Sequence, residues 1–399
     1  MISAHEYTLT VSGARLPITA GTVTLDETWS PYAQADVTID LPDAATLAQL
    51  DPRRGGRALL TLAARYGAPA PVSDLTALWG GQPLSAITAA WGGLTLRTIT
   101  AQLSEPYNDG GHRDSSIRTL DLGVVERRID RRAGTVRLAL ASDEALAQDY
   151  RPTTPTLPPT TSVRTCVALA LARIGATLEP GAADATVAAD AVLWEVGTSA
   201  WDYAHSLVDA AGLRLACDER RRWTLAQPLD PATSPGVYVV RGESAHELEE
   251  DLSREAWASC VIVTYSWELD GVRQVQHDIA GGGSPVLHLE VSRPFPRAGA
   301  AAAILDRVRA RGSIVTARQI GTYDVTPGWV MQSLATDTAH QAGLVSVVRW
   351  DLATDEVEVA SRDLSDTPPR AWIMQPAGYR WTDVPTGMTW QTYTTPMGA

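Results

Sequence analysis

The sequence contains no lysine, because all 33 of its cationic side chains are arginines, and it has only one asparagine (Asn108) and one phenylalanine (Phe295). These three residue types have AT-rich codons, so their scarcity indicates a GC-rich coding sequence and carries no information about the biochemical function. The remaining composition is ordinary, with 45% hydrophobic and 20% charged residues. It excludes collagen-like, disordered and membrane-spanning chains and favours a globular protein of roughly two to four domains.

Positive charge is scarce as well, since 46 acidic residues give a formal net charge of −13. This balance argues against tight binding of nucleic acid through a basic face. The acidic excess fits a protein surface along which nucleic acid moves without binding. The three cysteines, Cys166, Cys217 and Cys260, form no CxxC motif. We expect them to be small buried hydrophobic residues.

A cationic, apolar leader is not found at the start of the chain, where alternating sequence begins within a few residues. The longest apolar stretch, inside residues 166–174, is interrupted by Arg173 and is too short to cross a bilayer. The sequence therefore predicts a protein made in the cytoplasm, without a membrane span.

Catalytic signatures are also missing. His246 precedes acidic residues as in a zincin helix, but no second histidine follows four residues on. The triplet 112–114 lacks the downstream asparagine of a kinase, and the glycines at 281–283 do not open a phosphate-binding helix. We predict no catalytic residue, no metal ligand and no cofactor. The acidic run at 247–251 is interpreted as a solvated face rather than a glycosidase pair.

Period-two alternation of apolar and polar residues predicts a mainly β protein with α+β parts. Two β-barrel-like domains are expected to flank a small α+β domain, followed by a tryptophan-rich C-terminal tail. The expected boundaries are 1–150 for the first barrel with an insertion at about 67–94, 151–235 for a Pro/Thr linker and the α+β domain, 236–365 for the second barrel with one helix at 298–311, and 366–399 for the tail.

Capping residues predict the helices of the α+β domain. Ser162 precedes a helix over 163–174 that ends at Gly175. Thr198 or Ser199 precedes a helix over 200–211 that ends at Gly212. A hairpin follows, with strands at 213–217 and 222–226 around a polar turn.

Two tryptophan repeats stand outside the expected barrels. Trp79 and Trp91 lie in similar segments offset by twelve residues, and Trp372, Trp381 and Trp390 recur every nine residues. Segments this short cannot bury enough apolar surface to offset their ordering entropy. They either fold back on their own domain or dock on a neighbouring subunit. Because tryptophan is enriched at interface hot spots, these five residues are the candidate partner-docking sites.

Several stretches resemble phage tail hub proteins, the minor tail proteins of long-tailed phages of GC-rich actinobacteria that are related to the contractile baseplate hub and to late-control tail proteins. The clearest is Ser199-Ala-Trp-Asp through Gly212-Leu-Arg-Leu215, with Trp223 after a hairpin. The segments 23–32 and 125–130 and the tryptophan-rich tail are also similar to this family. The hairpin tip at 218–222 departs from the pattern because it has no glycine, which leaves its turn type open.

The resemblance implies a structural role at the tail tip of a virion. Hubs of this kind are homotrimers in which two barrels per chain form a ring of six, joining a sixfold tail tube to a threefold tip. The implied partners are the distal tail tube ring, the tape measure protein, further tip or fibre proteins reached through the C-terminal tail, and genomic DNA passing through the lumen without specific binding. Host attachment and genome ejection are the implied processes.

Two alternatives remain open from the residues. A tail-associated cell-wall hydrolase predicts a cleft with an acid/base pair. A receptor module that binds host glycans predicts exposed tryptophans as sugar platforms.

Overall fold

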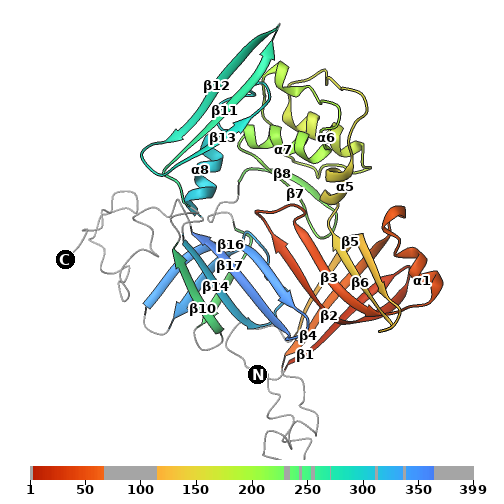
Figure 1. Cartoon of the computed structure of the whole chain (residues 1–399). Helices are drawn as coiled ribbons and strands as arrows, with labels where there is room; N and C mark the ends of the chain where they lie inside the picture. Colours follow the sequence, from red (N-terminus) through yellow and green to blue (C-terminus); the bar gives the residue numbers. More distant parts are fainter. Residues whose placement is uncertain are drawn as a thin grey trace, which may run out of the picture.

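The computed structural model describes residues 3–66, 115–228, 234–241, 245–252, 257–269, 271–310, 313–335 and 338–363. Strands dominate these ranges and a few helices accompany them, so the prediction of a mainly β fold with α+β parts is confirmed. In Figure 1 a large β layer lies below two smaller units that sit side by side above it. The expected insertion at 67–94 and the tail at 366–399 lie outside the described residues.

The first β half is a closed antiparallel barrel. Its strands pair in the order β1-β4-β5-β6-β3-β2, and β1 also pairs with β2, which closes the ring. The strands are β1 (Ser3–Val11), β2 (Ala14–Asp26), β3 (Ala33–Asp40), β4 (Arg57–Tyr66), β5 (Ser115–Asp130) and β6 (Thr135–Ala141). A short helix α1 (Ala44–Gln49) and a 3-10 turn η1 (Pro52–Arg54) connect β3 to β4.

The second β half adds six strands to the same sheet, in the order β9-β15-β16-β17-β14-β10. They are β9 (Val237–Arg241), β10 (Ala245–Leu252), β14 (Ser313–Ile320), β15 (Val330–Ala335), β16 (Thr338–Asp351) and β17 (Glu356–Asp363). Backbone pairing between β2 and β16 joins the two halves into one 12-stranded sheet. One hydrophobic core runs through both halves, from Leu9 and Leu60 in the first to Trp350 and Val359 in the second.

The α+β unit follows the sequence prediction closely. It contains α5 (Glu144–Asp149), α6 (Val163–Ala172), the 3-10 turn η2 (Ala189–Val192), α7 (Ala200–Ala210), β7 (Arg214–Cys217) and β8 (Trp223–Ala226). Ser162 and Ser199 cap α6 and α7 as predicted, each accepting a hydrogen bond from a backbone N–H three residues on. Gly175 and Gly212, after the two helices, adopt positive φ. The short α5 was not predicted.

A third unit has its own sheet and core. Strand β11 (Cys260–Leu269) pairs antiparallel with β12 (Val272–Gly281) and parallel with β13 (Val286–Val291). Helix α8 (Ala300–Ala310) covers one face, where Leu305 packs against Val261, Val263 and Tyr265. The sequence pattern placed these residues in the second barrel, because periodicity does not show which strands share a sheet. The domain boundaries at 150, 235 and 365 stay predictions.

Two further sequence expectations can be compared with the described residues. All three cysteines are buried, as predicted. No helix in the described part of the chain is long and apolar enough to cross a membrane.

Candidate assembly sites

The five tryptophans that the sequence singles out lie outside the described residues, so their docking role stays a prediction. The tryptophans that the structure describes include core residues, since Trp194, Trp223 and Trp350 are each 1% exposed. Trp29 differs, because its side chain is 67% exposed in the turn between β2 and β3. Composition alone could not separate these two groups.

One polar face crosses eight consecutive strands, in the order β5-β6-β3-β2-β16-β17-β14-β10. Strand alternation puts one set of side chains into the core and the other set on the opposite face. Because paired residues of neighbouring strands lie opposite each other, the outward-facing side chains form rows across the sheet. One row runs from Gln34 through Thr24, Arg349, Glu358 and Arg318 to Glu247. The face thus spans both β halves.

Acidic side chains outnumber basic ones on this polar face. At its described register positions we count ten carboxylates, namely Asp26, Asp36, Asp40, Glu126, Asp130, Glu247, Glu249, Asp351, Glu356 and Glu358, and five arginines, namely Arg128, Arg137, Arg318, Arg349 and Arg362. None of these side chains is buried. Two of the arginines are engaged by carboxylates of the face itself: Arg137 pairs with Asp36, and Arg318 with Glu247 and Glu358. The net charge of the face is therefore negative.

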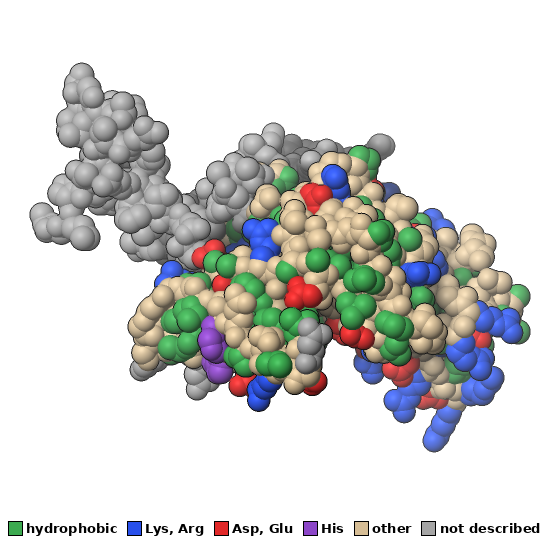
Figure 2. All heavy atoms as spheres, turned by 90° about the horizontal axis from the view of Figure 1, so that it is seen from above, with side chains coloured by type: hydrophobic (Ala, Val, Ile, Leu, Met, Phe, Trp, Pro, Cys, Tyr) green, Lys and Arg blue, Asp and Glu red, His purple; other side chains and the backbone are tan. Residues whose placement is uncertain are grey.

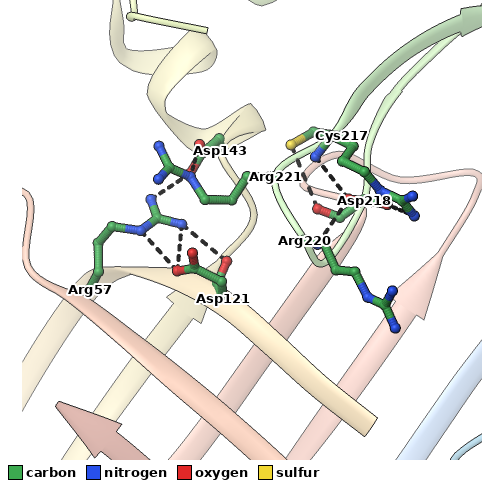
Figure 3. Close-up of polar contacts among 8 residues, drawn as sticks. Arg57, Asp121, Asp143, Cys217, Asp218, Arg220 and Arg221 are labelled. Carbon is green, nitrogen blue, oxygen red and sulfur yellow. Dashed lines mark hydrogen bonds and ion pairs between the residues drawn. The ribbon is translucent and has the colours of Figure 1, made fainter. Parts of the chain in front are cut away.

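The α+β unit is anchored to the first barrel through the tip of the β7–β8 hairpin. Figure 3 shows Arg57 between two carboxylates, with contacts of 2.9 Å to Asp121 on β5 and 2.6 Å to Asp143 beside α5. Asp143 also accepts from Nε of Arg221 at 2.8 Å. Arg221 occupies the left-handed region with φ 65°. The glycine missing from the hairpin tip is thus replaced by an arginine, and its ion pair offsets the backbone strain.

Arg118 joins three parts of the molecule at one point. It projects from β5 and is nearly buried, with an Nη2 contact of 2.6 Å to the Glu219 carboxylate at the hairpin tip. Its Nη1 donates to the carbonyl oxygens of Tyr323 (3.0 Å) and Val325 (2.7 Å) before β15. Its guanidinium also lies 5.3 Å from the ring centre of Trp350 on β16. No sequence pattern points to this residue.

Glu144 provides a second buried anchor. Its carboxylate accepts from the backbone N–H of Tyr32 (2.6 Å) and of Cys217 (2.9 Å), and from the Ser30 hydroxyl (2.9 Å). The β2–β3 turn and the hairpin are thereby held to the same group. Burial raises the pKa of Glu144, while these hydrogen bonds act in the opposite direction.

The two β halves also meet in a polar cluster. The Tyr323 hydroxyl lies 2.6 Å from Nδ1 of His5 and 2.8 Å from the Tyr7 hydroxyl, and Tyr7 donates to Asp355 at 2.6 Å. Burial lowers the pKa of His5, and the charge of Asp355 partly counters this shift. Glu27 and Arg362 form a further ion pair between the halves.

Exposed arginines gather at the end of the first barrel that carries η1 and the β5–β6 hairpin. They come from η1 and from the β5–β6 hairpin, and include Arg53, Arg54, Arg128, Arg131 and Arg132. Figure 2 shows this blue group at the right-hand end, with acidic side chains among it. At the β7–β8 hairpin, Arg221 and Arg222 pair with Asp143 and Asp218 of the same chain. The arginines at 131, 132 and 220–222 thus lie in hairpin turns rather than on the polar face.

Within the described residues, no group of three or more His, Cys, Asp or Glu side chains is arranged to hold a metal ion.

Comparisons with known proteins concern the fold. The tail protein from Neisseria meningitidis MC58 superposes with a TM-score of 0.54 at 12% identity, covering 90% of this chain and 97% of that chain. The 43 kDa tail protein of prophage MuSo2 from Shewanella oneidensis gives a TM-score of 0.50 at 11% identity, covering 90% and 98%. No family model matches the sequence, and no curated protein matches it.

At these identities the likeness shows a shared fold. The chain has the fold of phage tail proteins, with 90% of its length covered by each of these two structures, and the resemblance stated from the sequence is confirmed at that level.

Proposed function

We propose that this chain is a structural tail-hub protein at the distal end of a bacteriophage tail. It forms a homotrimeric ring that joins the sixfold tail tube to the threefold tip and lets DNA pass during ejection. It acts without catalytic turnover. The fold shared with two phage tail proteins supports the tail role. The tape measure protein and further tip or fibre proteins are the other proposed partners.

The acid-rich polar face carries the proposal of a DNA passage. Two β halves joined edge to edge present one continuous polar face on each chain. In a ring, this face is the proposed lining of the lumen. Ten carboxylates against five arginines would repel the DNA phosphates and keep the duplex from binding.

Light scattering of the purified chain tests the ring. We expect a particle of three times 42.7 kDa. A stable monomer that also degrades host cell wall would contradict the proposal and favour the hydrolase. A monomer that binds host glycan would favour the receptor module.

Charge reversal tests the lining. The variant Asp40→Arg, Glu126→Arg, Glu249→Arg changes three exposed carboxylates of the polar face. We expect this variant to bind duplex DNA with a steep salt dependence, while the wild-type chain does not bind.

A matched control keeps the same net charge. It reverses Glu179, Asp190 and Glu195, three exposed carboxylates of the α+β unit. Equal DNA binding by both variants would show that the position of the charge does not matter, and the lining proposal would fail.

A further inference from the structure

Two histidines converge on one hydroxyl on the outer face of the three-stranded sheet. The Thr264 hydroxyl on β11 lies 2.9 Å from Nδ1 of His277 on β12 and 2.8 Å from Nε2 of His288 on β13. This face is turned away from α8, because the alternate residues Val263 and Tyr265 pack in the core under the helix. Both imidazoles are exposed. Figure 2 shows histidine side chains at the surface on the side of this sheet, beside hydrophobic ones.

Hydrogen bonding alone does not require this arrangement. A threonine hydroxyl has one proton, so it can donate to only one of the two nitrogens, and the other nitrogen must donate to it. Because both rings are exposed, water could serve either of them equally well. Instead, two ring nitrogens from the strands on either side of β11 are directed at one point above it.

We propose that His277 and His288 bind one late first-row divalent cation, such as Cu²⁺ or Zn²⁺, through Nδ1 and Nε2 respectively. Imidazole nitrogen is a preferred ligand of these ions. Such ions bind imidazole nitrogen at about 2.0–2.1 Å, so the proposed cation lies between the two rings on the exposed face of β11. The tautomer of His288 then carries its proton on Nδ1, which frees the lone pair of Nε2.

The site is open rather than a closed structural centre. No third His, Cys, Asp or Glu is assembled with the pair in the described part of the chain. Water fills the remaining positions, and the cation ties β12 to β13 across β11. This inference does not depend on the proposed tail function, because it uses only the third unit.

The experiment uses the untagged full chain and copper(II) sulfate. We expect one Cu²⁺ per chain, with an electron paramagnetic resonance spectrum that shows two imidazole nitrogens. His277→Ala and His288→Ala should each weaken binding by more than about tenfold, since even an outer partner of a metal ligand contributes that much.

Two variants separate ligation from simple hydrogen bonding. Thr264→Val removes the hydroxyl but neither ligand, and it should retain copper binding. His205→Ala removes a partly exposed histidine of α7 that pairs with Asp209, and it should leave the affinity unchanged. Circular dichroism without metal checks that all variants fold. The proposal is overturned if the double variant His277→Ala, His288→Ala binds copper as tightly as the wild type, or if the spectrum shows fewer than two nitrogens.

Discussion

Arg118 is the residue whose replacement tests the described packing most directly. Its guanidinium meets the Glu219 carboxylate at 2.6 Å and two backbone carbonyls, while its side chain is 9% exposed and that of Glu219 is 13% exposed. Arg118→Met keeps an unbranched apolar chain in place of the aliphatic part of the arginine. The change removes the charge and the donors, together with the volume of the guanidinium group.

The expected loss of stability follows from what Arg118→Met leaves behind. The carboxylate of Glu219 stays in a largely dry pocket without its partner, and breaking a buried ion pair in this way costs about 3–5 kcal/mol. The carbonyls of Tyr323 and Val325 lose a donor as well, at roughly 1–3 kcal/mol each where water cannot replace it. We therefore expect the free energy of unfolding to fall by at least about 3 kcal/mol.

Urea unfolding followed by circular dichroism measures this difference. The control is Arg220→Ala, an exposed arginine of the same hairpin, which should change the free energy by less than about 0.5 kcal/mol. The double variant Arg118→Met, Glu219→Leu removes both charges, and it should be more stable than Arg118→Met alone. A loss below about 0.5 kcal/mol for Arg118→Met would refute the role of this residue as the point where three parts of the fold are joined.

Three further predictions concern a turn, the partly buried His5 and the buried Glu144. Gly281→Ala should lower the free energy of unfolding in urea by about 1–3 kcal/mol, because φ is +77° and the new Cβ would lie 2.2 Å from the Ser259 carbonyl oxygen. The control is Gly282→Ala, whose new Cβ meets nothing within 4 Å, and it should be near neutral. Because the pKa of His5 is lowered in the folded chain, the unfolded chain takes up a proton first, and the free energy of unfolding should fall as the pH drops below about 6.5. His5→Gln should reduce that loss. Equal pH profiles for the variant and the wild type would contradict the prediction. The raised pKa of Glu144 has the opposite consequence, because the free energy of unfolding should fall as the pH rises above 4.5. If Glu144→Gln shows the same dependence of stability on pH, Glu144 does not titrate in this range.

Local signals in the sequence predicted a good part of the fold. Ser162 and Ser199 marked the starts of two helices because a side-chain oxygen can accept the first unpaired N–H groups. The alternation of Asp36, Thr38 and Asp40 with apolar residues predicted a strand with one buried face. The residues of the anchors gave no such signal. Arg118 and Glu219 are 101 positions apart, and nothing near either of them shows that they meet.

Some candidate sites can also be recognised in the sequence, whereas others emerge only from the fold. The tryptophan repeats are visible in the sequence because repetition is a local property, and their docking role stays a prediction. The polar face was not visible, since its ten carboxylates come from strands at both ends of the chain. An excess of acidic residues was evident from composition, but its concentration on one surface depends on strand order.

The sequence by itself therefore determined that the chain is mainly β, where helices α6 and α7 begin, which face of strands such as β3 is buried, and that the whole chain is acidic. Only the tertiary structure decided that β2 pairs with β16, that 260–310 forms a separate sheet and helix, and that His277 and His288 meet over Thr264. The physical reason is that alternation reports burial, whereas the backbone groups that join one strand to another are the same in every residue except proline. Neighbours in a sheet are chosen by packing across the whole molecule.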